Sequence, residues 1–123
     1  LLQLPPSLSR DVSKINAVAA ALPKNHGIKI AFEFRCGSWY CPQVYEALRK
    51  HNFAICENVS PDNSTIRTRQ VTADWCYLRF HKNKERTVTD YANEQLAIEA
   101  ERIVERHCMG LVQYAFFLND HGV

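Results

Sequence analysis

The sequence predicts an α/β fold, and more specifically a partial TIM-like (β/α)8 barrel with five strands and the helices between them. Apolar, strand-like runs alternate with segments of helical periodicity, which is typical of βαβ units and a mainly parallel sheet. Three of the runs end on charged or polar side chains, as strands do at the ligand-binding face of a barrel. The chain opens inside a strand and stops soon after its last one. We therefore expect residues 1–123 to be a single domain, a fragment of a larger barrel that lacks the N-terminal strands and the final helix.

The first half of the chain is predicted to contain three strands and two helices. Apolar residues recur at helical spacing between positions 10 and 22, and Pro23 ends that segment. Pro42 occupies a favoured first-turn position for the second helix. The predicted elements, in order, are a strand end at 1–4, a helix at 10–22, a strand at 28–35, a helix at 42–51 and a strand at 53–56.

The second half is predicted to contain a polar loop at 60–68, a strand at 75–80, a helix at 93–107 and a strand at 111–118. The helix has the clearest periodicity, and Gly110 follows it as a stop signal. Its charged residues lie mostly on other faces (Glu94, Glu99, Glu101, Arg102 and Arg106). One stripe of the helix is expected to face inward, formed by Leu96, Ala100, Ile103, Val104 and His107.

The composition indicates a folded domain without a membrane span. The chain has 123 residues, 46% of them hydrophobic and 23% charged, which is too apolar for disorder. Its apolar stretches are interrupted well before the ~20 residues that a span requires, and no signal-peptide pattern is present. A formal net charge of +2 supports nucleic-acid binding only weakly. The basic stretch at 82–86 is interpreted as a solvated loop.

The five cysteines indicate a reducing compartment. An odd number without a CxxC pair argues against a secreted disulfide framework and against a zinc ribbon. Cys56 and Cys76 lie inside apolar runs and are expected to be buried, whereas Cys36 and Cys41 flank a turn and are able to approach each other. We therefore predict a cytoplasmic protein.

Glu33 and Arg35 form the first candidate pair. They are two residues apart on a predicted strand, so their side chains point to the same side while Phe32 and Phe34 face the surrounding helices. Two interpretations stay open. The pair either fills the lumen of the barrel as a structural ion pair, or Glu33 transfers protons or binds ligand while Arg35 binds an anionic or carbonyl oxygen.

Arg79 and His81 repeat this spacing at the end of another strand, and Tyr77 shares their face. Histidine titrates near neutral pH, which suits a general acid or base, although a lone histidine is more often a structural hydrogen-bonding group. Two arginines that converge in a lumen favour a phosphate or carboxylate ligand. The main candidates for a site at the strand ends are therefore Glu33, Arg35, Arg79 and His81.

Four other residues complete the predicted site. Asn119 and Asp120 follow the last strand, where the alternative is a turn. Trp39 lies on the loop after Arg35 and either stacks on a ligand or anchors the loop. Gln3 stands at the first strand end. The predicted catalytic residues are Glu33, His81 and Asp120, and the predicted substrate-binding residues are Gln3, Arg35, Trp39, Arg79 and Asn119.

Several short segments resemble, in order and spacing, the YecE-like family, whose domain is of unknown function. The resemblance implies a TIM-like barrel of roughly twice this length, of which this chain is the C-terminal half, about the fourth to the eighth strand. The segments are Leu2-Gln3-Leu4-Pro5-Pro6-Ser7, Ala31-Phe32-Glu33-Phe34-Arg35, Ser38-Trp39, Val71-Thr72-Ala73-Asp74, Tyr77-Leu78-Arg79-Phe80-His81, Tyr91 and Asn119-Asp120.

The chain departs from the family pattern at three places. Cys36-Gly37 stands where the family usually has a His-Pro pair, and Leu118 stands where a second Asn is usual. Glu57-Asn58 occupies the place after the third strand where an acidic residue is common. If the missing His acts in the family's chemistry, activity in this protein is altered or lost.

The predicted function is binding of a small polar or anionic ligand at the strand ends, with acid or base chemistry by a carboxylate and a histidine. The alternative is a non-catalytic module that binds nucleic acid or a protein partner, so whether the protein is an enzyme stays open. No glycine-rich phosphate loop, HExxH or GxSxG motif is present, and we predict no cofactor. A metal site formed by Glu33, His81 and Asp120 is the less favoured alternative to a metal-free site.

Overall fold

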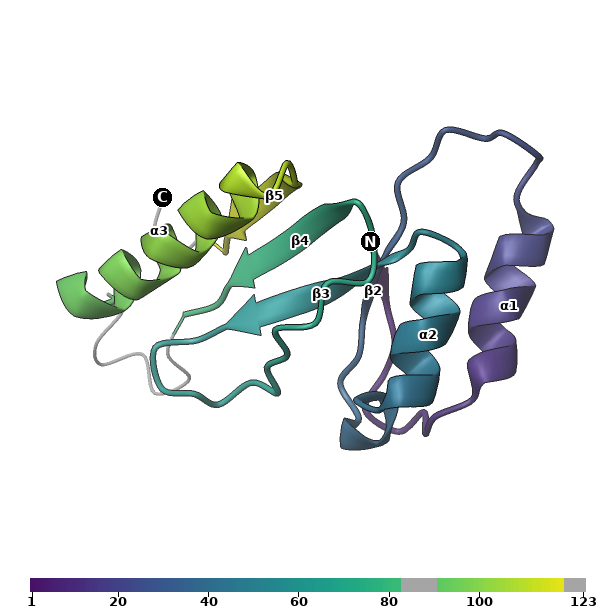
Figure 1. Cartoon of the computed structure of the whole chain (residues 1–123). Helices are drawn as coiled ribbons and strands as arrows, with labels where there is room; N and C mark the ends of the chain where they lie inside the picture. The colour runs from purple at the N-terminus through teal and green to yellow at the C-terminus, as the bar shows by residue number, and fades with distance from the viewer. Residues whose placement is uncertain (83–90, 119–123) are drawn as a thin grey trace.

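Five parallel strands form one sheet in which the spatial order of the strands follows the sequence, β1-β2-β3-β4-β5. The computed structural model describes residues 1–82 and 91–118 (Figure 1). Its elements are β1 (Leu2–Gln3), α1 (Val12–Ala21), β2 (Ala31–Glu33), the 3-10 helix η1 (Gly37–Trp39), α2 (Pro42–Lys50), β3 (Ala54–Val59), β4 (Trp75–Phe80), α3 (Asn93–Cys108) and β5 (Val112–Phe117). The predicted α/β fold with a parallel sheet is confirmed.

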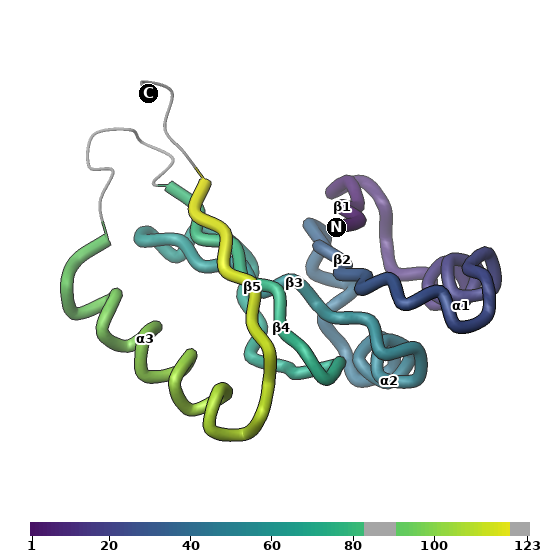
Figure 2. Tube along the Cα trace, turned by 90° about the horizontal axis from the view of Figure 1, so that it is seen from above, coloured from purple at the N-terminus to yellow at the C-terminus, as the bar shows by residue number. Residues whose placement is uncertain are grey.

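The α-helices pack on one face of the sheet, which we call the outer face. Figure 2 shows α1 and α2 beside each other and α3 next to β5. Every second residue of each strand points to the outer face, and most of these residues are apolar. Phe32, Phe34 and Ile55 form one core with Ile15 of α1 and with Val44 and Leu48 of α2.

The opposite, inner face carries the other half of the strand residues. Near the start of the strands it is apolar, where Ala31, Ala54 and Trp75 pack together with Tyr77 beside them. On β5 the inner face is open to solvent, since Tyr114 and Phe116 are 41% and 43% exposed. The inner face becomes polar toward the C-terminal ends of β2, β3 and β4.

The local end signals of the helices act as their chemistry predicts. Asp11 caps α1 by accepting a hydrogen bond from the backbone N–H of Ser13 at 3.0 Å. Pro42 is in the first turn of α2. Gly110 follows α3 with φ of 82°, a left-handed conformation that glycine adopts without strain.

The predicted inward stripe of α3 is wrong. Leu96 and Val104 are 38% and 59% exposed, and the buried residues of this helix are Glu99 and Arg106, with Ile103 partly buried. The reason lies in β3, which places the carboxylate of Glu57 on the outer face with only 4% exposure. A buried carboxylate requires charged partners, so α3 turns its arginines toward it.

Strand lengths also differ from prediction. β3 extends to Val59 instead of ending at Cys56, because Glu57 and Asn58 are both buried and paired in the sheet with β4. β2 is limited to Ala31–Glu33, shorter than the predicted strand. No helix lies between β3 and β4.

Among the residues that the structure describes, no helix is long and apolar enough to cross a membrane.

Candidate functional site

The C-terminal ends of β2, β3 and β4 place polar side chains together on the inner face. Glu33 ends β2, Asn58 lies near the end of β3, and Arg79 lies near the end of β4. Asn58 and Arg79 are register partners in neighbouring parallel strands. Because the strands are parallel, residues far apart in the sequence converge at this one end of the sheet. The sequence predicted this for Glu33 and Arg79.

Glu33 is the electrostatic centre of the cluster. Its side chain is only 3% exposed and forms an ion pair with Arg79 of β4, whose side chain is 16% exposed. Arg35 lies on the other side, with its Nε 3.9 Å from Glu33 Oε1 and with half of its side chain exposed. Two guanidinium groups thus surround one carboxylate, which leaves a surplus of one positive charge.

His81 lies beside this group and is linked to β3. Its Nε2 is 2.8 Å from Oδ1 of Asn58, a residue that is 4% exposed. An amide oxygen accepts, so Nε2 carries the proton and Nδ1 is the basic nitrogen. Burial lowers the pKa of His81 below its ordinary value, and the positive charges of Arg79 and Arg35 act in the same direction against the opposite effect of Glu33. The neutral form of the imidazole is therefore favoured.

A pocket of about 380 Å³ opens over these side chains. Its second wall comes from the loop between β3 and β4, which contributes the hydroxyl groups of Ser64 and Thr65 and the apolar side chain of Ile66. The pocket thus combines one guanidinium group, one carboxylate, hydroxyl groups, an imidazole and an apolar patch. It is lined by Glu33, Phe34, Arg35, Asn58, Ser64, Thr65, Ile66 and His81.

The loop that forms this wall is held by Arg67. Its Nη2 lies 2.7 Å from Glu99 of α3 and 3.1 Å from Glu57 of β3. Arg102 and Arg106 of α3 contact the same Glu57, and Arg102 also pairs with Glu99. At the other end of the loop, Thr72 accepts from the backbone N–H of Ile55 at 2.9 Å. No helix lies between β3 and β4, and these side-chain contacts hold the loop in place.

The other predicted site residues divide into three groups. Trp39 is fully buried, stacks on Phe34 at 4.7 Å and donates from Nε1 to the carbonyl of Leu8 at 2.8 Å. This packing favours the loop-anchor interpretation over ligand stacking, and we leave Trp39 out of the site. Gln3 is exposed and pairs in register with Glu33. Asn119 and Asp120 lie outside the described residues, as does the basic stretch after Lys82.

No metal centre is formed by the residues whose placement is described. Within 1–82 and 91–118, no three His, Cys, Asp or Glu side chains are close enough to hold a metal ion. Of the metal site considered from sequence, Glu33 and His81 lie in the cluster, while Asp120 lies beyond the described part of the chain.

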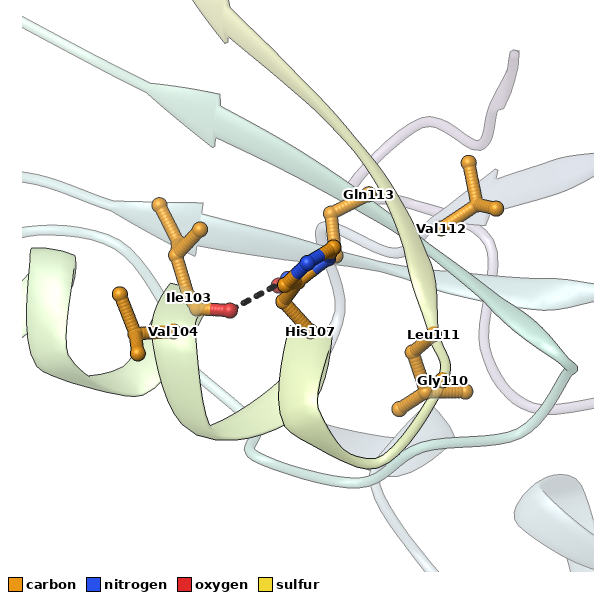
Figure 3. Close-up of a pocket in the computed structure, with 7 residues that line it drawn as sticks. All are labelled: Ile103, Val104, His107, Gly110, Leu111, Val112 and Gln113. Carbon is orange, nitrogen blue, oxygen red and sulfur yellow. Dashed lines mark hydrogen bonds between the residues drawn. The ribbon is translucent and has the colours of Figure 1, made fainter.

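A second cavity, of about 490 Å³, lies at the opposite end of the sheet (Figure 3). It is formed between the last turns of α3 and the start of β5, where Gln113 donates from Nε2 to the carbonyl of Ile103 at 2.7 Å. Its walls are mostly apolar, with His107 as the one ionisable side chain among the described residues that line it. It lacks the converging charges of the pocket at the strand ends, so the latter is the better candidate.

Sequence reasoning missed Asn58, Ser64 and Thr65. Asn58 had a usable signal, since it is two residues after Cys56 in an apolar run and so faces the same side of the strand. It was not counted because the strand was expected to end at Cys56. Ser64 and Thr65 carry no such signal, because a polar loop residue becomes a wall of a pocket only through long-range packing.

The comparisons with known proteins agree with this architecture. The model of a family described as "Protein of unknown function DUF72" matches residues 1–123. A DUF72 family protein from Thermotoga maritima is similar in structure, with a TM-score of 0.75, 26% identity, and coverage of 94% of this chain and 48% of that one. A DUF72 family protein from Enterococcus faecalis has a TM-score of 0.75 at 21% identity, with 98% and 53% coverage. The chain thus spans about half the length of these solved structures. No curated protein matches it.

Proposed function

Since the chain belongs to the DUF72 family, we propose that it forms the later part of a TIM-like barrel that binds a small anionic ligand at its strand ends. The YecE-like family that the sequence resembles is this same family. Its function is unknown, so membership supplies a fold and no activity. The proposal about the ligand rests on the side chains of this chain alone.

Three features support the barrel. The five strands are parallel and follow the sequence in order, and their helices lie on one face, as in the wall of a (β/α)8 barrel. The inner face carries exposed apolar side chains on β5, as the lumen side of an unclosed wall would. The solved relatives are about twice as long as this chain. In such a barrel the pocket at the strand ends occupies the usual place of the active site.

The observation that carries the anion proposal is the pair of guanidinium groups around the single carboxylate of Glu33. Arg79 is bound to Glu33 and mostly buried, so it is not the main ligand contact. Arg35 is half exposed, lines the pocket and is only loosely paired at 3.9 Å. A guanidinium in this state has donors free to bind a phosphate or carboxylate, and the surplus charge favours an anion.

His81 is the group that we propose for proton transfer. It lines the pocket, burial favours its neutral form, and Nδ1 is its basic nitrogen because Asn58 accepts from Nε2. Glu33, bound by two arginines, holds and orients Arg35 and Arg79. The role of Asp120 as a catalytic residue stays a prediction from sequence.

The test measures the binding of two simple anions, inorganic phosphate and acetate. Calorimetry gives the affinity, and NMR chemical shifts of the His81 ring report whether the anion binds near it. We expect the protein to bind at least one of them, and Arg35→Met to weaken that binding about tenfold or more, the value of a lost charge-assisted hydrogen bond.

Arg49→Met is the matched control. Arg49 is exposed in the last turn of α2, where it bonds to Val71 and Gln70 at the other end of the sheet. Its replacement removes the same charge and should leave anion binding unchanged. The proposal fails if neither anion binds at about 10 mM, or if Arg35→Met and Arg49→Met weaken binding equally.

A further inference from the structure

A pair of thiols lies on the loop between β2 and α2. Cys36 precedes η1 and Cys41 immediately precedes α2, and both are partly exposed free thiols. Ser38 joins them to the segment before α1: its Oγ is 3.2 Å from Cys36 Sγ and accepts from the backbone N–H of Arg10 at 2.9 Å. The guanidinium of Arg10 then donates from Nη1 to Cys41 Sγ at 3.2 Å. None of these four residues lines the pocket at the strand ends.

Cys41 combines two features that stabilise a thiolate. The first is the direct contact with a guanidinium, which is always protonated. The second is its place as the N-cap residue of α2, a helix of nine residues whose N-terminus carries a partial positive charge. The described partners of Cys36 are neutral groups, the hydroxyl and the backbone amide of Ser38. Electrostatics therefore rank Cys41 above Cys36 as a nucleophile.

The pKa directions of the thiols follow these surroundings. Partial burial raises the pKa of Cys41, but the hydrogen bond from Arg10 and the nearby backbone amides outweigh it, so the pKa lies below its ordinary value. The hydrogen bond with Ser38 lowers the pKa of Cys36. Burial raises the pKa of Cys56 to about 12 and also raises that of Cys76. The two thiols of this loop thus differ from the buried thiols of Cys56 and Cys76 in the direction of their pKa shifts.

We propose that Cys41 is a nucleophilic thiolate that undergoes thiol–disulfide exchange with low-molecular-weight disulfides. The Cys41 sulfur attacks one sulfur of the disulfide, a new S–S bond forms, the old S–S bond breaks, and the other half leaves as a thiolate. The products are a mixed disulfide on Cys41 and one small thiol, so no further oxidant is required.

Cys108 provides an internal control for exposure. It is more exposed than Cys41, but it is the last residue of α3 and so lies at the opposite end of a helix dipole from the one that Cys41 occupies. Simple exposure predicts that Cys108 reacts first. The cluster around Arg10 predicts that Cys41 reacts first. The two explanations therefore give opposite orders for the same pair of residues.

The experiment treats the native protein with oxidised glutathione at pH 7 and measures the rate of mixed-disulfide formation at each cysteine by peptide mass spectrometry. We expect Cys41 to react fastest, ahead of Cys36 and Cys108. Arg10→Met should slow Cys41 about threefold or more and leave the rate at Cys108 unchanged, whereas Arg10→Lys should retain most of the rate because it keeps the charge.

The variants are suitable because Arg10 is exposed, so its replacement is not expected to unfold the protein. Two results would overturn the proposal. One is a rate at Cys108 equal to or above that at Cys41, and the other is a Cys41 rate that is the same in Arg10→Met as in the unaltered protein.

Discussion

The strongest consequence of the site geometry concerns Arg79→Met. Removing this guanidinium leaves the carboxylate of Glu33, 3% exposed, with Arg35 as its described ionic partner. A buried charge that loses a close partner is destabilised far more than an exposed one, because neither water nor a full ion pair replaces the lost interaction. The variant should therefore weaken folding as well as alter the pocket.

The magnitude follows from the burial of the two partners. Breaking a buried ion pair on one side costs about 3–5 kcal/mol of the free energy of unfolding. Arg35 remains 3.9 Å away and half exposed, so it screens Glu33 in part, and the expected loss is about 3 kcal/mol. Arg35→Met removes the exposed partner and should cost only about 0–1 kcal/mol.

Urea unfolding with the rest of the proposed barrel present, monitored by tryptophan fluorescence, measures both losses, since Trp39 and Trp75 are buried and report on the core. The double variant Glu33→Gln/Arg79→Met should recover more than half of the loss, because it removes the buried charge as well as its partner. An Arg79→Met variant that is destabilised no more than Arg35→Met would refute the view that Glu33 depends on Arg79.

Two other predictions concern His81 and the inner face. NMR of the ring nitrogens should find His81 neutral with a protonated Nε2 at pH 7, and the pKa of His81 in the folded protein should lie below about 6.5. Because folding lowers this pKa, the contribution of His81 to stability is present above about pH 6.5 and is lost as the pH falls. A pKa of His81 above about 6.5 in the folded protein without ligand would contradict this prediction. Residues 1–123 expressed alone should self-associate, with a weak near-UV circular dichroism signal, because Val112, Tyr114 and Phe116 are exposed on the inner face. A monomer with a sharp two-state melt, by ultracentrifugation and calorimetry, would count against the half-barrel proposal.

The part of the site that could be predicted is the part that depends on local backbone geometry. Alternation along a strand places Glu33 and Arg35 on one side, and Arg79 and His81 on one side, whatever the rest of the chain does. The alternation of strands and helices then implies a parallel sheet, which brings the ends of different strands together. These two local rules were sufficient to expect Glu33 and Arg79 at one site.

The sequence by itself therefore determined the class of fold, the order of the elements and the side of the sheet to which each strand residue points. The tertiary structure alone decided which partners meet across elements. It paired His81 with Asn58, joined the buried ring of Trp39 to the carbonyl of Leu8, and turned the arginines of α3 toward Glu57 in place of the apolar stripe. Side-chain direction repeats with the period of the local backbone, but burial of a charge or a ring depends on residues tens of positions away. The local periodicity of the sequence does not identify which of those distant residues pack together.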